Sequence, residues 1–128
     1  MAIEPAAAQY AAARRTPAQL QELVRAAARF KRESADIAAA VAAVVEFFTA
    51  VSAASGNQVL ALSQAPLNDL LAPTLTQMID RVPQARKRIQ DAQGKILAAI
   101  KDKKSEQARV WMEKHIHDFK RGHELESR

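Results

Sequence analysis

The sequence predicts an all-α fold in which the helices pack as an antiparallel bundle. Hydrophobic residues make up 48% of the chain and are rich in alanine, whereas aromatic residues make up 5% and there are only 3 glycines. Apolar residues recur at three- and four-residue intervals, and alternating strand-like runs are nearly absent. Short connections between long helical segments favour antiparallel neighbours. The 128 residues suffice for one domain, residues 1–128, with a sizeable core.

Two helices are predicted at the start of the chain. The first covers residues 4–13 and precedes a clear start signal at Thr16 and Pro17. Threonine is a good N-cap, and proline suits the first helical position. The second helix should therefore run from Pro17 to about Lys31. We expect its inward face to comprise Leu20, Leu23, Val24, Ala27 and Phe30.

The third predicted helix covers residues 37–54, with Ser34 or Asp36 as its cap. It should end at Gly56, because glycine suits the left-handed conformation that closes many helices. A fourth segment, residues 58–79, is interrupted by two prolines. We expect Pro66 to kink or restart this helix and Pro73 to bend it, since proline removes a backbone hydrogen bond.

Two further helices complete the predicted bundle. Pro83 opens a fifth helix that extends to about residue 101, and residues 102–104 form a turn. Ser105 should cap the last helix, which should end at Gly122.

Charge and composition exclude several classes of protein. The net charge of +5 could attract nucleic acid, but the basic residues are scattered and lack interleaved aromatic residues, so a solvated surface is favoured. The absence of cysteine excludes disulfides and thiolate zinc sites and fits a cytoplasmic protein. We find no signal peptide and no apolar run of about 18 residues, and therefore expect no membrane segment.

Two polar residues lie on helix faces that should be buried. His115 falls within the apolar stripe of the last helix, and Gln93 within that of the fifth. A buried polar group without a partner costs about 1–3 kcal/mol, so each needs a partner from the protein, from water or from a ligand. Trp111 shares the stripe of His115 and is expected in the core or in a dimer interface.

Several stretches of the chain, in order, resemble the C-terminal effector domain of GntR-type transcription regulators, and most closely the FadR-type group with its FCD domain. The matching residues are Ile3-Glu4-Pro5, Thr16-Pro17, Phe47, Ala53-Ala54-Ser55-Gly56-Asn57, Ile96-Leu97, Ala99-Ile100, Ala108, Met112 and His115. The resemblance implies six or seven helices around a small-molecule pocket, homodimerisation, and control of a preceding winged helix-turn-helix DNA-binding domain. Because Met1 falls about where the family's effector domain begins, we expect the chain to be a fragment without that DNA-binding domain.

Many members of this family hold a divalent metal with one aspartate and three histidines. The resemblance places Val44 and Phe48 at the first two ligand positions, Gln93 at the third and His115 at the fourth. One imidazole and one carboxamide do not make a transition-metal site, which needs three or four N, O or S ligands. The other candidate ligands are expected to point away from this face or to lie in a tail: His117, Glu46 and His123. We therefore expect no metal and no other cofactor.

The residues and the resemblance together predict an effector-binding and dimerisation domain rather than an enzyme. The expected ligand is a small organic molecule with an apolar body and one polar group, contacted by His115, Gln93, Phe48 and Val44. One alternative is a ligand-free dimerisation bundle in which Phe48 fills the former metal cavity and Gln93 bonds His115. A second is a basic, nucleic-acid-binding bundle. No glycine-rich phosphate loop, cysteine or convincing histidine–carboxylate pair supports catalysis.

Overall fold

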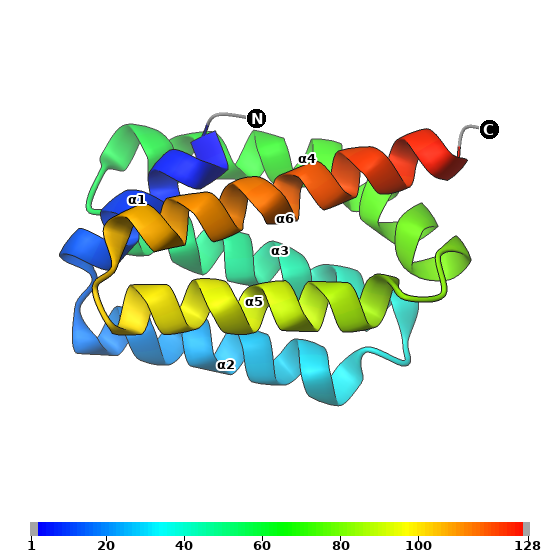
Figure 1. Ribbon diagram of the computed structural model, residues 1–128, viewed down its shortest axis with the longest axis horizontal. Coiled ribbons are helices and arrows are strands. Elements are labelled where there is room, and N and C mark those ends of the chain that lie inside the picture. Colours follow the sequence, from blue (N-terminus) through cyan, green and yellow to red (C-terminus); the bar gives the residue numbers. More distant parts are fainter. Residues whose placement is uncertain (1–2, 127–128) are drawn as a thin grey trace.

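Six α-helices make up the described part of the chain, residues 3–126, in this computed structural model (Figure 1). Side chains are described up to Lys120. The helices are α1 (Ile3–Arg14), α2 (Pro17–Glu33), α3 (Ile37–Ala54), α4 (Gln58–Arg81), α5 (Ala85–Lys101) and α6 (Ser105–Glu126). The predicted all-α class and the count of six to seven helices are therefore confirmed.

The core helix of the bundle is α3, which packs against α1, α2 and α4. Its residues are apolar enough, over 18 positions, to cross a membrane by length and composition alone, so the expectation that no such run exists was wrong. The apolar character of α3 is explained by its burial inside the bundle. Half of that window is buried inside the bundle, including Phe47, Phe48 and Val51. A helix buried by neighbours on several sides becomes hydrophobic around most of its circumference.

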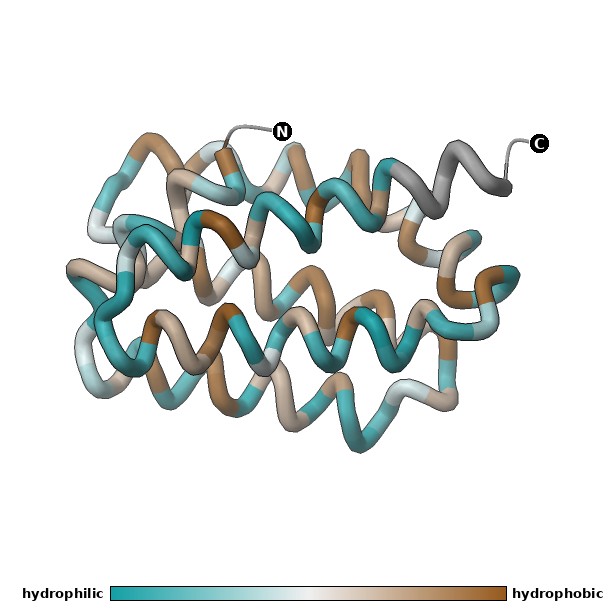
Figure 2. The backbone as a smooth tube through the Cα atoms, in the orientation of Figure 1, coloured by the Kyte–Doolittle hydropathy of each residue, from teal (hydrophilic) through white to brown (hydrophobic). Residues whose placement is uncertain are grey.

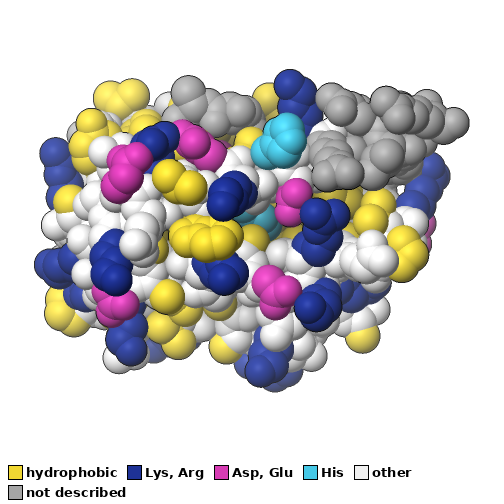
Figure 3. Space-filling model, viewed as in Figure 1, with side chains coloured by type: hydrophobic (Ala, Val, Ile, Leu, Met, Phe, Trp, Pro, Cys, Tyr) yellow, Lys and Arg dark blue, Asp and Glu magenta, His cyan; other side chains and the backbone are white. Residues whose placement is uncertain are grey.

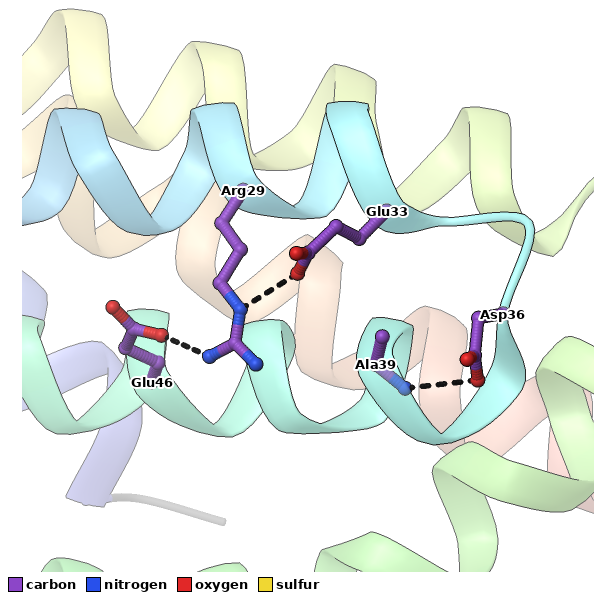
Figure 4. Close-up of polar contacts among 5 residues, drawn as sticks. All are labelled: Arg29, Glu33, Asp36, Ala39 and Glu46. Atoms are coloured by element: carbon purple, nitrogen blue, oxygen red, sulfur yellow. Dashed lines mark hydrogen bonds and ion pairs between the residues drawn. The ribbon is translucent and has the colours of Figure 1, made fainter.

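The single charged residue of α3 is held by an ion pair at the surface. Arg29 on α2 donates to Glu46 across the α2–α3 interface over 2.5 Å and to Glu33 on its own helix over 2.8 Å (Figure 4). All three side chains are more than a third exposed, so the network adds little to stability.

The starts of α2, α3 and α4 follow the sequence signals closely. Thr16 and Gln19 form a capping box at the start of α2, with each side chain accepting from the other's backbone amide. Of the two candidate caps for α3, Asp36 is the one used, because its carboxylate accepts from the Ala39 amide. Asn57 likewise caps α4 through a bond from the Leu60 amide.

Gly56, two residues after the end of α3, adopts a left-handed φ of 67°, as predicted. A side chain there would be strained, since this region is rarely adopted by residues with a Cβ atom. The turn between α5 and α6 uses a left-handed Lys103 instead.

Some local expectations were wrong. Val24 is 48% exposed, because the buried face of α2 runs through Leu23, Ala26 and Phe30. Of the two outcomes expected at Pro66, a kink or a restart, the restart does not occur: α4 continues through both prolines, and Figure 1 shows it turning toward α5 near its end. Each proline removes one backbone hydrogen bond from α4. Because α4 packs against α3 and α6, this loss can bend the helix but does not end it.

The boundaries of the last two helices also differ from expectation. Pro83 lies in the turn before α5, which begins at Ala85. Ser105 is the first residue of α6 rather than a residue preceding it, and the helix runs past Gly122 to Glu126. His123 therefore lies within a helix, and its side chain is outside the described residues.

Candidate functional site

His115 lies at the centre of an aromatic cluster that joins α6 to α3. Its side chain is 2% exposed. The ring centroids of His115 and Phe119 are 4.3 Å apart, and those of His115 and Phe48 are 5.7 Å apart. The Phe48 and Phe119 rings meet edge-to-face at 6.0 Å. Burial in this apolar setting lowers the pKa of His115 to about 3, so the imidazole is neutral at pH 7.

Gln93 lies on the buried face of α5, between Ile89 and Ile96, and is 1% exposed. Its Nε2 atom has no hydrogen-bond partner, and the same is true of His115 Nε2. The direct bond between Gln93 and His115 that the sequence left open is not formed. Two buried polar nitrogens are thus left unpaired, each at a cost of about 1–3 kcal/mol.

Val44 and Phe48, one turn apart on α3, are both fully buried. They stand where the resemblance places an aspartate and a histidine. Among the described residues, no group of three or more His, Asp or Glu side chains is placed to hold a metal. The four side chains offer one imidazole and one carboxamide, and the aligned neighbours of His115 on α3 are the apolar Val44 and Phe48. These residues do not fit the metal centre that the resemblance implies.

A groove of about 640 Å³ lies between α5 and α6, and His115 lines it. Figure 3 shows this hollowed face, with dark-blue and magenta side chains around the hollow. Charged residues from both helices form much of the lining: Arg88, Asp91, Lys95, Lys114 and Asp118. His115 is therefore both a core residue and part of the groove's lining.

Trp111 also lines the groove, where it is half-buried. The Lys95 ammonium lies 4.6 Å from the Trp111 ring centroid and the Lys114 ammonium lies 4.5 Å from it. These cation–π contacts occupy the ring, so it is not free to stack on a nucleic-acid base. Trp111 was expected in the core or in a dimer interface, and it is partly buried: one side packs against the core and the outer edge remains at the surface.

The arginines near the start of α5 are used to hold the fold. Arg86 donates to the backbone carbonyls of Ser34 and Ile79, at 2.5 and 3.3 Å. Arg88 pairs with Asp118 across the α5–α6 interface over 3.4 Å. His117 is exposed, as its position on α6 predicted, and lies at the edge of the groove.

A second buried polar cluster joins α1 to α4 and was missed by the sequence reasoning. Glu4 is fully buried, and its Oε1 accepts a hydrogen bond from Gln64 Nε2 over 3.3 Å. Gln64 Oε1 in turn accepts from the Ser52 hydroxyl over 2.6 Å, and Gln64 Nε2 also donates to Asn68. Glu4 Oε2 has no partner, and burial raises the pKa of Glu4 to about 7.

The signal for this cluster was present in the sequence. Glu4 precedes Ala7, Ala8 and Ala11 at helical spacing, so it lies on the buried stripe of α1. This is the same pattern that singled out His115. Applied to the first helix, it would have found Glu4 as well.

The chain was compared with models of known families. The model of the FCD domain, which is the C-terminal effector-binding domain of GntR-family regulators, matches residues 1–118. Comparison with curated proteins gives no match.

Proposed function

The chain belongs to the FCD domain family, and from this premise we propose that residues 1–128 form a single effector-binding and dimerisation domain of a cytoplasmic GntR-type regulator. A small organic ligand would bind near His115 and favour one arrangement of the helices. The ligand would act on DNA through the winged helix-turn-helix domain that accompanies FCD domains in this family. Control of this kind requires the ligand to bind two arrangements with different affinity.

The observation that supports this proposal is the pair of unpaired nitrogens, Gln93 Nε2 and His115 Nε2. Buried polar groups in folded proteins are normally satisfied, so an orphaned pair indicates that something else supplies the partner. A groove beside His115 gives a ligand a route to at least one of them. Val44 and Phe48 would contact the apolar body of the ligand from α3.

The charge state of the site narrows the class of ligand. His115 is neutral at pH 7, because burial depresses its pKa. A neutral imidazole and a carboxamide suit a hydroxyl, a carbonyl or an amide group. The proposed effector therefore combines an apolar body with one uncharged polar group at its inner end.

Thermal unfolding in the presence of a panel of small alcohols, ketones and amides would identify binders. A ligand that binds only the folded state at 100 times its Kd stabilises it by about 2.7 kcal/mol. Calorimetry would then compare each binder on the native chain and on the His115→Ala/Gln93→Ala variant. We expect at least a tenfold weaker affinity in the variant; equal affinity would remove both residues from the site.

A ligand-free dimerisation bundle is the second candidate, and the packing of Phe48 favours it. The Phe48 ring contacts both His115 and Phe119. In a bundle without a ligand, the Phe48 side chain would occupy the space that the metal fills in other members of the family. A high-resolution density map of the interior separates the two candidates. Ordered water or close-packed side chains around Gln93 would favour the second, and density for an organic molecule would favour the first.

A further inference from the structure

A row of exposed apolar side chains runs along the outer face of α4. Val59, Leu62 and Leu70 are 72%, 71% and 72% exposed, and they are the three most exposed large hydrophobic residues among those described. Pro66 and Pro73 are exposed on the same helix. At 100° per residue these five side chains fall within an arc of about 80°, so they form one continuous stripe. We call Val59, Leu62, Pro66, Leu70 and Pro73 the α4 stripe; hydrophobic segments are visible along the outer edge of α4 in Figure 2.

The α4 helix itself carries few charged residues. All 19 Lys and Arg residues lie in residues 14–32 and 81–128, so the first 23 residues of α4 carry none. The only acidic residues of α4 are Asp69 and Asp80. A nucleic acid or an acidic protein would need cations at the contact, and the stripe offers none. The surface of an anionic membrane would need basic flanking residues for the same reason.

The spacing of the stripe is symmetric about Pro66. Leu62 and Leu70 each lie four residues from Pro66, and Val59 and Pro73 each lie seven residues from it. Two copies of α4 that cross antiparallel at Pro66 would therefore bring every apolar position opposite an apolar position. Leu62 of one copy would face Leu70 of the other, and Val59 would face Pro73. This is the self-complementarity that a two-fold interface requires, because each residue pair occurs twice.

We infer that the α4 stripe is the face through which two copies of this chain pair, with the α4 helices antiparallel and the two-fold axis beside Pro66. The charge distribution supports a second copy as the partner. Two chains of net charge +5 repel one another, and the stripe lets them meet without placing cations against cations. The inference rests on the dimerisation proposed above and is independent of effector binding.

The pairing of Leu62 with Leu70 can be tested by charge substitution. The variants Leu62→Glu and Leu70→Lys each place a charge in an apolar contact, so each should raise the dimer dissociation constant at least tenfold. In the double variant Leu62→Glu/Leu70→Lys, the new carboxylate of one copy would face the new ammonium of the other at both ends, and dimerisation should recover. The matched double variant Leu62→Glu/Leu70→Glu places like charges together and should remain monomeric.

Sedimentation equilibrium over a wide concentration range, on the full chain, gives the dissociation constants. Val24→Glu is the control, because Val24 is a half-exposed apolar residue on α2 and should not affect pairing. Circular dichroism checks that each variant folds, and Leu62→Ser/Leu70→Ser provides an uncharged variant that should also weaken the dimer.

Three results would overturn the inference, and they have different meanings. A native chain that stays monomeric would refute both dimerisation and this interface. A dimer that the single variants leave unchanged would refute only the interface. Single variants that dissociate the dimer, with no recovery in the oppositely charged double variant, would refute the antiparallel arrangement about Pro66.

Discussion

Gln64 Nε2 on α4 lies 3.3 Å from Glu4 Oε1 on α1, a contact between residues 60 positions apart that ties the first helix to the fourth. The Glu4 carboxyl is fully buried and one of its oxygens has no partner. Gln64 favours the charged form through its hydrogen bond, but desolvation is the larger effect and raises the pKa of Glu4 to about 7. The start of α1 is thereby made sensitive to pH near neutrality.

The Glu4→Gln variant should change how stability depends on pH. In the native chain the folded state holds the Glu4 proton up to a pKa of about 7, against 4.5 for an ordinary glutamate. Stability from this group is therefore present below pH 4.5 and is lost as pH rises through 7, by up to about 3 kcal/mol. Urea unfolding from pH 4.5 to 8 should show the variant gaining stability relative to the native chain as pH rises.

Glu22→Gln is the control for this experiment, since it removes a carboxylate that is exposed on α2. A difference between Glu4→Gln and the native chain that stays constant from pH 4.5 to 8 would contradict the raised pKa of Glu4.

His115 should produce the opposite dependence on pH. Its folded-state pKa is lowered from 6.5 to about 3, so its contribution to stability is present above pH 6.5 and is lost as pH falls toward 3. The full loss amounts to about 5 kcal/mol. Between pH 4.5 and 6.5 the contributions of Glu4 and His115 have opposite slopes and largely cancel.

The His115→Leu variant keeps only the contribution of Glu4. Between pH 4.5 and 6.5 its free energy of unfolding, relative to that of the native chain at the same pH, should therefore fall as pH rises. His117→Leu serves as the control, because it removes an exposed imidazole from the same helix. A His115→Leu variant whose difference from the native chain does not change with pH would show that the imidazole is not desolvated.

Much of the fold was predictable because its signals are local. The starts of α2, α3 and α4 depend on caps at Thr16, Asp36 and Asn57, and a cap is visible within four residues of sequence. The continuity of α4 through Pro66 was not predictable in this way. It depends on packing against α3 and α6, which a local pattern does not contain.

The candidate site was predictable only in part, for a related reason. Periodicity correctly placed His115 and Gln93 on buried faces. Whether their nitrogens meet depends on the relative rotation of α5 and α6, and no sequence pattern gives this. The groove and the lysines around Trp111 likewise arise from the packing of two helices.

Replacing Gln93 by leucine should stabilise the chain. Gln93 Nε2 has no partner, and the residue lies on the same buried face of α5 as Ile89, Ile96 and Ile100. Leucine removes the unpaired amide at similar volume, so the free energy of unfolding should rise by about 1–2 kcal/mol. Urea unfolding measures the change. A loss of stability would mean that a water molecule or a ligand satisfies the amide.

Two glycine-to-alanine substitutions should have opposite effects. Gly56 has a φ of 67°, and an added Cβ would lie 3.0 Å from Cδ of Arg14, so Gly56→Ala should cost about 1–2 kcal/mol. Gly94 is helical and open on the side where a Cβ would lie, so Gly94→Ala should add about 0.5–1 kcal/mol. Thermal unfolding of both variants tests this pair; a stabilised Gly56→Ala would contradict the left-handed turn.

The last prediction concerns whether the four aligned positions converge inside the bundle. We expect these positions, which are Val44, Phe48, Gln93 and His115, to surround one point. The variant Val44→Asp/Phe48→His/Gln93→His then completes a set of one carboxylate and three imidazoles with His115. It should therefore bind a divalent transition metal. Zinc or nickel should raise its midpoint of thermal unfolding by several degrees, and the native chain should show no such shift.

Adding His115→Ala to that variant should abolish the metal-dependent shift, since it removes the fourth ligand. A variant that folds only when metal is present would also support convergence, because metal binding can drive folding. A folded variant whose unfolding midpoint is unaffected by either metal would mean that the four positions do not converge on one point. His115 and Gln93 would then belong to separate parts of the core.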